Sequence, residues 1–273
     1  MDRTTKTLMI TLCGLITSLA TAAILSLIEV RGNLAIYSYM LWFIVPAGAI
    51  GAGFVAAIGY YFGARWTNYR PDEILLASMV VVSALTYFAL HYFTYSTLRI
   101  EGIPLSSVVS YPRFLQFAIT NQTYTIGHTS TGGIQLGAWG YGITAIQIIG
   151  FSAGGLIVYG MLQGLPFCGD CSRYLVNKGT QNREAKDGEA IGQTTERVAA
   201  LMTEGKLQEA IREHATQPDE KLGRKATHRT TLLLRRCPVC DKHQLDLKSA
   251  VRGRDSWAEI IVGTATTPQT LTL

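Results

Sequence analysis

A sharp change in composition divides this 273-residue chain near residue 165. Residues 1–165 hold only seven of the 24 Lys and Arg residues and five of the 19 Asp and Glu residues. Long apolar runs fill most of this part, whereas polar sequence continues from residue 166 almost to the end. Because a soluble domain needs a charged surface, the first part is a poor candidate for one. We therefore predict two domains of different kinds, at 1–165 and 166–273.

Four apolar runs are long enough to cross a bilayer as helices, which takes about 20 residues each. They cover residues 8–28, 36–62, 74–98 and 136–162. A cleaved signal peptide is the rival interpretation of the first run, because Ala20-Thr21-Ala22 has the form of a cleavage site. We favour a retained helix, since apolar sequence continues to Ile28. The prediction is an all-α transmembrane bundle of four helices in a multi-pass membrane protein.

Small residues and one proline indicate how these helices pack. Glycines recur four residues apart, at Gly59 and Gly63 and again at Gly150 and Gly154. This spacing lets helix backbones approach closely in a membrane. Pro46 lacks the N–H that would bond back one turn, so we expect it to kink the second helix.

Two polar residues lie inside the apolar runs. His91 lies among aromatic residues near the end of the third run, and Gln147 lies near the centre of the fourth. We expect each side chain to hydrogen-bond a neighbour, because an unpaired polar group in hydrocarbon is costly. The alternative for His91 is a ligand or a proton-relay residue.

The connection at 99–135 is where we would look for an extracytoplasmic binding site, although no residue set in it stands out. Ser110 followed by Tyr111 and Pro112 indicates the start of a short helix, with Ser110 as its cap. Such a helix could lie in the membrane interface or fold back over the bundle.

Basic residues predict the orientation in the membrane. Lys and Arg gather before the first run, between the second and third, and after the fourth, at Arg3, Lys6, Arg65, Arg70, Arg173 and Lys178. The opposite side has only Arg31, Arg99 and Arg113. Cytoplasmic loops carry the excess of positive charge, so we expect both termini in the cytoplasm and the chain in the cell (inner) membrane.

Four of the five cysteines form two Cys-x-x-Cys pairs, Cys168 with Cys171 and Cys237 with Cys240. Both sulfurs of such a turn can point to one side, so two facing turns make a four-sulfur cage suited to zinc. We predict one structural zinc ion per chain at these residues. A closed four-cysteine site leaves no open position for a substrate water, which argues against zinc hydrolysis. Cys13 is expected to be a packing residue.

Cys237-Pro-Val-Cys240 lies between two strand-like runs and resembles the second knuckle of a zinc ribbon, while Cys168-Gly-Asp-Cys171 resembles the first. This resemblance covers a few dozen residues and implies zinc and a small β-hairpin, but no activity. It departs from the common pattern at Asp241, where such knuckles often carry glycine. The 65 residues between the pairs exceed the spacing of simple ribbons.

The long spacing predicts a small α+β zinc-ribbon-like domain with a helical insertion at about 179–216. Residues 179–193 are polar and unpatterned and indicate a linker. Two short helices are expected at 194–203 and 207–215. Strands are expected at 230–236, along 244–251 with an end or a bulge at Ser249, and at 257–262, with frayed sequence from 263 onward.

Other uses of the cysteines remain open. The pairs could be redox-active or disulfide-bonded, another metal could bind, or His243, His214 or His228 could replace a cysteine in a mixed site. Membrane enzymes that pass electrons from dithiols to quinone are also four-helix bundles with Cys-x-x-Cys pairs, and this chain is superficially similar to them. Their reactive cysteines work on the oxidising side, whereas the predicted topology puts these four in the reducing cytoplasm.

The leading hypothesis is a membrane protein without catalytic activity, whose cytosolic zinc-held domain is an interaction or regulatory module. The sequence has no Walker A loop and no His-Glu-x-x-His. The expected partners are the lipid bilayer and a protein at the cytosolic domain, and a homo-oligomer is also open. A modest basic cluster suits anionic headgroups or a protein better than nucleic acid, and it consists of Arg224, Lys225, Arg229, Arg235 and Arg236. The alternatives are a quinone-linked thiol-disulfide oxidoreductase and a passive channel or small-solute transporter.

Overall fold

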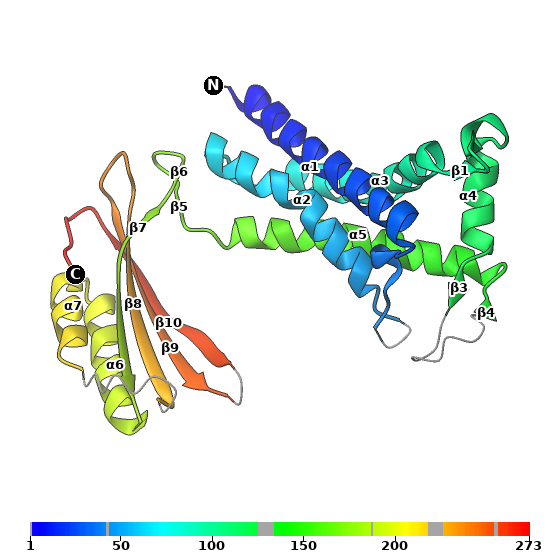
Figure 1. Cartoon of the computed structure of the whole chain (residues 1–273). Coiled ribbons are helices and arrows are strands. Elements are labelled where there is room, and N and C mark those ends of the chain that lie inside the picture. The colour runs from blue at the N-terminus through cyan, green and yellow to red at the C-terminus, as the bar shows by residue number, and fades with distance from the viewer. Residues whose placement is uncertain (1, 42–43, 125–133, 187, 218–225, 254–255) are drawn as a thin grey trace. The chain divides into compact units, whose positions relative to one another are not determined.

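Two separate units make up the chain in its computed structural model, which describes residues 2–41, 44–124, 134–186, 188–217, 226–253 and 256–273. Contacts within the chain divide it into unit 1, Met1–Gly164, and unit 2, Leu165–Leu273. Each unit has a hydrophobic core of its own, so each is described by itself (Figure 1).

Unit 1 is built from helices. Its long helices are α1 (Arg3–Gly32), α2 (Ala47–Thr67), α3 (Glu73–Thr97) and α5 (Trp139–Gln163). These four are long and apolar enough to cross a membrane. The shorter elements are η1 (Ile36–Ser38), β1 (Arg99–Ile100), β2 (Ile103–Pro104), η2 (Leu105–Ser107), α4 (Tyr111–Thr120), β3 (Thr123–Tyr124) and β4 (Ile134–Gln135).

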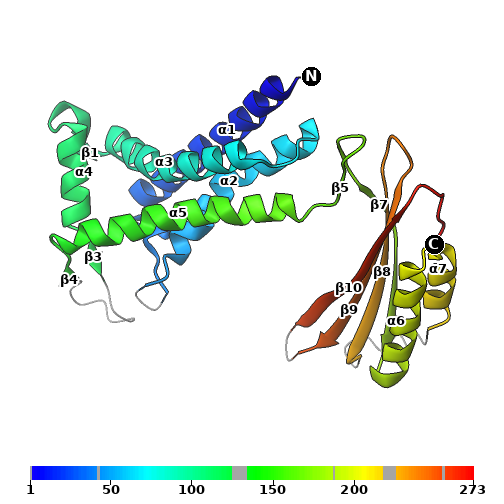
Figure 2. The same ribbon diagram turned by 180° about the vertical axis from the view of Figure 1, so that it is seen from behind.

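Close backbone approach holds the long helices together, as the glycine spacing predicted. Helix α1 packs on α2 and α3, and α5 packs on the same two helices (Figure 2). A Cβ on Gly154 of α5 would collide with backbone atoms of Gly53 and Phe54 in α2. Between α1 and α2, the Thr17 hydroxyl donates a 2.7 Å hydrogen bond to the carbonyl oxygen of Ala56. Small residues therefore line the contacts between these helices and allow their backbones to approach closely.

Pro46 starts a helix rather than kinking one. Helix α2 begins at Ala47 with Pro46 as its N-cap, and Ile36–Ser38 forms a separate 3-10 turn. The predicted run at 36–62 is thus wrong in its first third. The first turn of a helix has no intrahelical acceptors for its N–H groups, so a proline costs little there. The helix continues to Thr67 and ends at Asn68, whose φ of 51° is left-handed.

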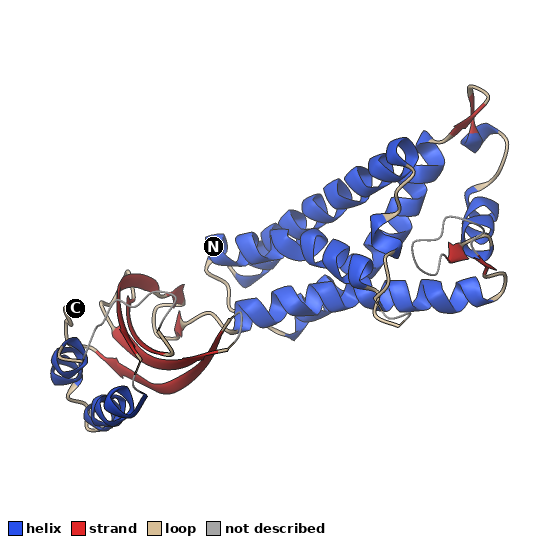
Figure 3. Ribbon diagram, turned by 60° about the horizontal axis from the view of Figure 1, so that its bottom comes forward, coloured by secondary structure: helices blue, strands red, loops and turns tan. Residues whose placement is uncertain are grey.

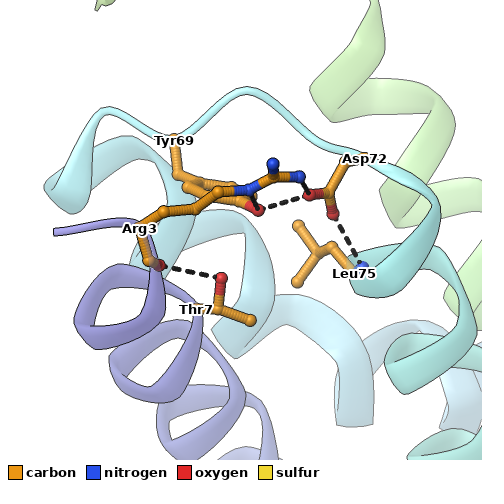
Figure 4. Close-up of polar contacts among 5 residues, drawn as sticks. All are labelled: Arg3, Thr7, Tyr69, Asp72 and Leu75. Carbon is orange, nitrogen blue, oxygen red and sulfur yellow. Dashed lines mark hydrogen bonds and ion pairs between the residues drawn. The ribbon is translucent and has the colours of Figure 1, made fainter.

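The start of α1 lies beside the α2–α3 connection (Figure 4), and both are at one end of unit 1 (Figure 1). Arg3 Nη2 lies 2.6 Å from Asp72 Oδ2, and the Tyr69 hydroxyl donates to the same carboxylate. Asp72 also caps α3, because its Oδ1 accepts a 2.9 Å hydrogen bond from the Leu75 N–H. We call this the Arg3 end, and it contains two of the basic clusters used to predict orientation.

Helix α4 folds back over α3 and α5 at the other end of unit 1 (Figure 2). The Tyr111 hydroxyl donates a 3.0 Å hydrogen bond to the carbonyl oxygen of Phe88 in α3. On the α5 side, Gly140 lies against the backbone of Ile119. Ser110 stands at the N-cap position as expected, but its side chain makes no capping hydrogen bond.

Unit 2 is an antiparallel sheet with two helices against it (Figure 3). The sheet order is β10-β9-β8-β7. Its elements are β5 (Phe167–Cys168), β6 (Arg173–Tyr174), β7 (Val176–Ala185), α6 (Gly188–Thr203), α7 (Leu207–Ala215), β8 (His228–Arg236), β9 (His243–Arg252) and β10 (Trp257–Thr267). Apolar side chains of α6, α7, β8 and β9 form the core, including Val198, Ile211, Leu232 and Leu247.

Three details of unit 2 differ from prediction. The expected linker at 179–193 contains most of strand β7 and the start of α6. Strand β9 runs past Ser249 to Arg252, and β10 continues past Gly263 to Thr267. The irregularity expected near Ser249 lies instead in β10, where the register shifts between Ile261 and Gly263. Strands β7 and β10 form the two edges of the sheet, and neither has the regular apolar alternation that predicts a strand.

Candidate metal centre

The first cysteine pair lies in a short hairpin. Strands β5 and β6 pair Phe167 with Tyr174 and Cys168 with Arg173, so residues 169–172 form the turn. Ser172, directly after the second cysteine, has a φ of 50°. This left-handed residue turns the chain back, which keeps both cysteines on one side of the hairpin.

The second pair lies in the turn between β8 and β9. Arg236 pairs with His243, and the Cys237 N–H donates a 2.8 Å hydrogen bond to the Lys242 carbonyl oxygen. Asp241 follows the second cysteine and has a φ of 54°, which matches Ser172 in the first hairpin. The two turns are therefore built alike. Asp241 stands where the zinc-ribbon pattern often has glycine, and aspartate is among the non-glycine residues that tolerate this conformation.

Strand β7 brings the two turns together. It follows β6 after one residue and pairs with β8, with Val176 opposite Arg236. The start of β7 thus lies beside the end of β8, where the second turn begins. An ion pair of 3.3 Å between Lys242 Nζ and Asp170 Oδ2 also links the turns. The sequence contains a signal for this ion pair, since the first turn carries Asp170 and the second carries Lys242, but the prediction did not include it.

The four sulfur atoms of Cys168, Cys171, Cys237 and Cys240 all lie within 4.8 Å of one another. The Cys168 and Cys240 sulfurs are 3.7 Å apart. In a tetrahedron with metal–sulfur bonds of about 2.3 Å, the sulfurs are about 3.8 Å apart. All four cysteines are free of disulfides. Four cysteines that fit a zinc-ribbon-like knuckle arrangement therefore form a cluster that could hold a metal ion.

The surroundings give the thiols unequal pKa values. Burial raises the pKa of Cys168, while the Cys240 thiol and burial raise the pKa of Cys171 to about 12. Burial also opposes ionisation of Cys237, but hydrogen bonds from the N–H groups of Cys240 and Val239 outweigh it and lower the pKa to about 7. Backbone donors aimed at one sulfur stabilise a thiolate, which is the form that binds metal.

No histidine joins the cysteine cluster in the part of the chain that the structure describes. His214 is buried, with Nδ1 3.2 Å from Gln181 Oε1, and His228 Nδ1 lies 2.9 Å from the Thr227 hydroxyl. His243 is buried on β9 beside the second turn. The mixed-ligand alternative therefore has no support from these positions.

Acidic partners accompany the arginines of the predicted basic cluster. Arg229 lies 2.6 Å from Glu184, Arg235 pairs with Asp246, and Arg236 lies 3.4 Å from Asp241. Arg224 and Lys225 lie outside the described residues. Because paired arginines present little net charge, the described part of this cluster is a weak attractant for anions.

One catalytic motif occurs in the sequence without the structure that it needs for catalysis. Residues 150–154 read Gly-Phe-Ser-Ala-Gly and match the Gly-x-Ser-x-Gly pattern of hydrolases. That pattern requires a sharp strand-to-helix turn that exposes the serine. Here the five residues lie inside the continuous helix α5, where Gly150 and Gly154 pack against α2 and Pro46. This match is therefore a packing motif.

Comparison with known proteins gives no match, whether to family models, to curated proteins or to solved structures.

Proposed function

We propose that this protein is a multi-pass membrane protein whose cytosolic unit 2 is held by one structural zinc ion and serves as an interaction or regulatory module. The observation that carries the proposal is the cysteine cluster. Two hairpins from distant parts of the sequence bring four sulfurs within 4.8 Å of one another. Four thiolates at tetrahedral spacing suit zinc, and a site with four protein ligands is typical of structural rather than catalytic zinc.

The membrane part of the proposal rests on unit 1. Four helices have the length and hydropathy to span a bilayer, and many of their large apolar side chains face outward. Outward apolar side chains suit contact with lipid. With the basic Arg3 end on the cytoplasmic side of the cell (inner) membrane, the positive-inside rule also places unit 2 in the cytoplasm.

The first test is the metal content of full-length protein purified without added metal. We expect about one zinc ion per chain. The Cys237→Ser/Cys240→Ser variant should lose the metal, while Cys13→Ser, in unit 1, should keep it. A wild-type protein with no zinc, or a double variant with undiminished zinc, would overturn the zinc assignment.

A thiol-disulfide oxidoreductase is the second candidate, because Cys240 is exposed and within 3.7 Å of Cys168. An exposed sulfur next to a second thiol is accessible to exchange partners. In metal-free protein, oxidation of paired thiols to a disulfide by quinone, with formation of quinol, and reduction of that disulfide by the dithiol of thioredoxin would favour this candidate. Thiols that do not cycle with quinone would remove it.

A further inference from the structure

Unit 1 contains a cavity of about 460 Å³ at the end opposite Arg3. Its walls come from the ends of α1 and α3, from the first half of α5 and from α4, which lies across this end. The volume falls within the range of small-molecule sites. The connection at 99–135, where the sequence places a possible binding site, contributes Phe114, Phe117 and Gln122 to the wall.

Glu29 gives the cavity a negative charge. Its Oε1 accepts a 3.0 Å hydrogen bond from the Tyr37 hydroxyl, and its Oε2 accepts a 2.9 Å bond from the Thr94 hydroxyl. Both donors are neutral, and no Lys or Arg is among the described residues that line the cavity. A carboxylate at the edge of a membrane protein, with no basic residue among the described residues of its cavity, favours a ligand that brings a positive charge.

Two buried acceptors in the same wall lack partners. His91 is 3% exposed and Gln147 is 1% exposed. Even so, His91 Nε2 and Gln147 Oε1 have no hydrogen-bond partner among the described residues. Buried polar atoms in folded proteins nearly always have a partner, so an unpaired atom in a cavity wall indicates a ligand. A neutral imidazole with its proton on Nδ1 accepts through Nε2.

Aromatic rings supply part of the remaining wall, beside aliphatic side chains such as Leu98 and Ile143. The Tyr37 ring meets the His91 ring edge to face at 5.7 Å between centroids, and Phe114 and Phe117 line the α4 side. Such rings pack against hydrocarbon and also attract an ammonium group. We propose that this cavity binds a small organic cation, an alkyl- or arylalkylammonium compound. Its ammonium donates to Glu29, Gln147 and His91, and its apolar body packs against the aromatic wall.

The test uses full-length protein in lipid nanodiscs and isothermal titration with methylammonium, butylammonium and 2-phenylethylammonium. The neutral 2-phenylethanol and sodium chloride are the matched comparisons. We expect saturable binding of at least one ammonium compound, and at least about tenfold weaker binding of 2-phenylethanol. Equal binding of the alcohol, or no saturable binding of any of the three ammonium compounds up to about 1 mM, would overturn the proposal. Displacement by millimolar sodium would also overturn it in favour of an inorganic cation.

Two variants separate binding from folding. Glu29→Gln and Gln147→Leu should each weaken binding about tenfold or more, whereas Glu101→Gln, an exposed acid in the same unit outside the cavity, should not. Thermal unfolding of each variant shows whether unit 1 remains folded. If both cavity variants are folded and bind like the unmodified protein, the cavity is not the ammonium site.

Discussion

Val176 of β7 lies opposite Arg236 of β8 in the antiparallel sheet of unit 2. This one register position explains how cysteine pairs separated by 65 residues come together. The first cysteine turn precedes Val176 and the second follows Arg236. Because the strands are antiparallel, both turns lie at the same end of the sheet. The helices α6 and α7 lie between β7 and β8 in the intervening sequence and pack on the sheet, and neither contributes a cysteine to the cluster.

Metal removal should unfold unit 2 and leave unit 1 folded. Zinc binding to such sites contributes about 10–16 kcal/mol, which is similar to or larger than the whole stability of a domain, about 5–15 kcal/mol. After chelation, limited proteolysis should degrade unit 2, and circular dichroism should retain the helical signal of unit 1. A unit 2 that resists protease after complete zinc loss would contradict this prediction.

Asp241→Gly should leave the zinc-bound stability of unit 2 unchanged or raise it by up to about 1 kcal/mol, because glycine adopts a φ of 54° without strain. The loss of the exposed contact to Arg236, at 3.4 Å, offsets little of this gain. Asp241→Val should destabilise by about 1–2 kcal/mol, because a β-branched side chain crowds this conformation. Thermal unfolding of the two variants decides the matter, and equal losses in both would show that the aspartate side chain itself is required.

Gly154→Leu should destabilise unit 1 by about 1–3 kcal/mol or more, because its side chain would enter the backbone of α2. Gly160→Leu in the same helix is the control, since a Cβ there meets no atom within 4 Å. Thermal unfolding in detergent measures both. Equal melting temperatures for the two variants would disprove the close contact between α2 and α5.

Acid should weaken unit 2 through His214. Burial, assisted by the charge of Arg183, lowers the pKa of His214 to about 4 from its usual value near 6.5. Between these values the unfolded chain binds a proton that the folded chain does not, so stability is fully present above about 6.5 and falls with pH toward 4. The expected slope is about 1.4 kcal/mol per pH unit.

The control for this prediction is His214→Gln, studied with excess zinc because acid also displaces metal from thiolates. Denaturant unfolding at several pH values should give a shallower slope for this variant than for the unmodified chain. Identical slopes would mean that His214 does not cause the acid sensitivity.

Local sequence predicted the helices and the cysteine cluster well, because apolar length and Cys-x-x-Cys turns are short-range signals. Strand β7 was missed because it is a polar edge strand whose partner lies about 50 residues away, as with Asn182 opposite Thr231. Pro46 was misjudged because the same residue can kink a helix or begin one, and the preceding turn decides which.

The cavity could not be predicted from the sequence either. Glu29 lies after the uncharged part of its apolar run, where it resembles an ordinary helix-end residue. The hydroxyls of Tyr37 and Thr94 hold the Glu29 carboxylate in the cavity wall, and they contact it only when α1, η1 and α3 are packed together. The sequence marks His91 and Gln147 as unusual, but among the described residues His91 Nε2 and Gln147 Oε1 have no hydrogen-bond partner.

The wide separation of the two cysteine pairs sets an order of events during synthesis. The ribosome makes Cys171 before Cys237, and at about 5–20 residues per second the 65 intervening residues take roughly 3–13 seconds. Throughout that interval the nascent chain has only two of the four thiols, which cannot form a complete cage. With the proposed zinc site, a polypeptide that stalls before Cys240 never acquires the full set of ligands, so metal uptake would distinguish finished chains from interrupted ones.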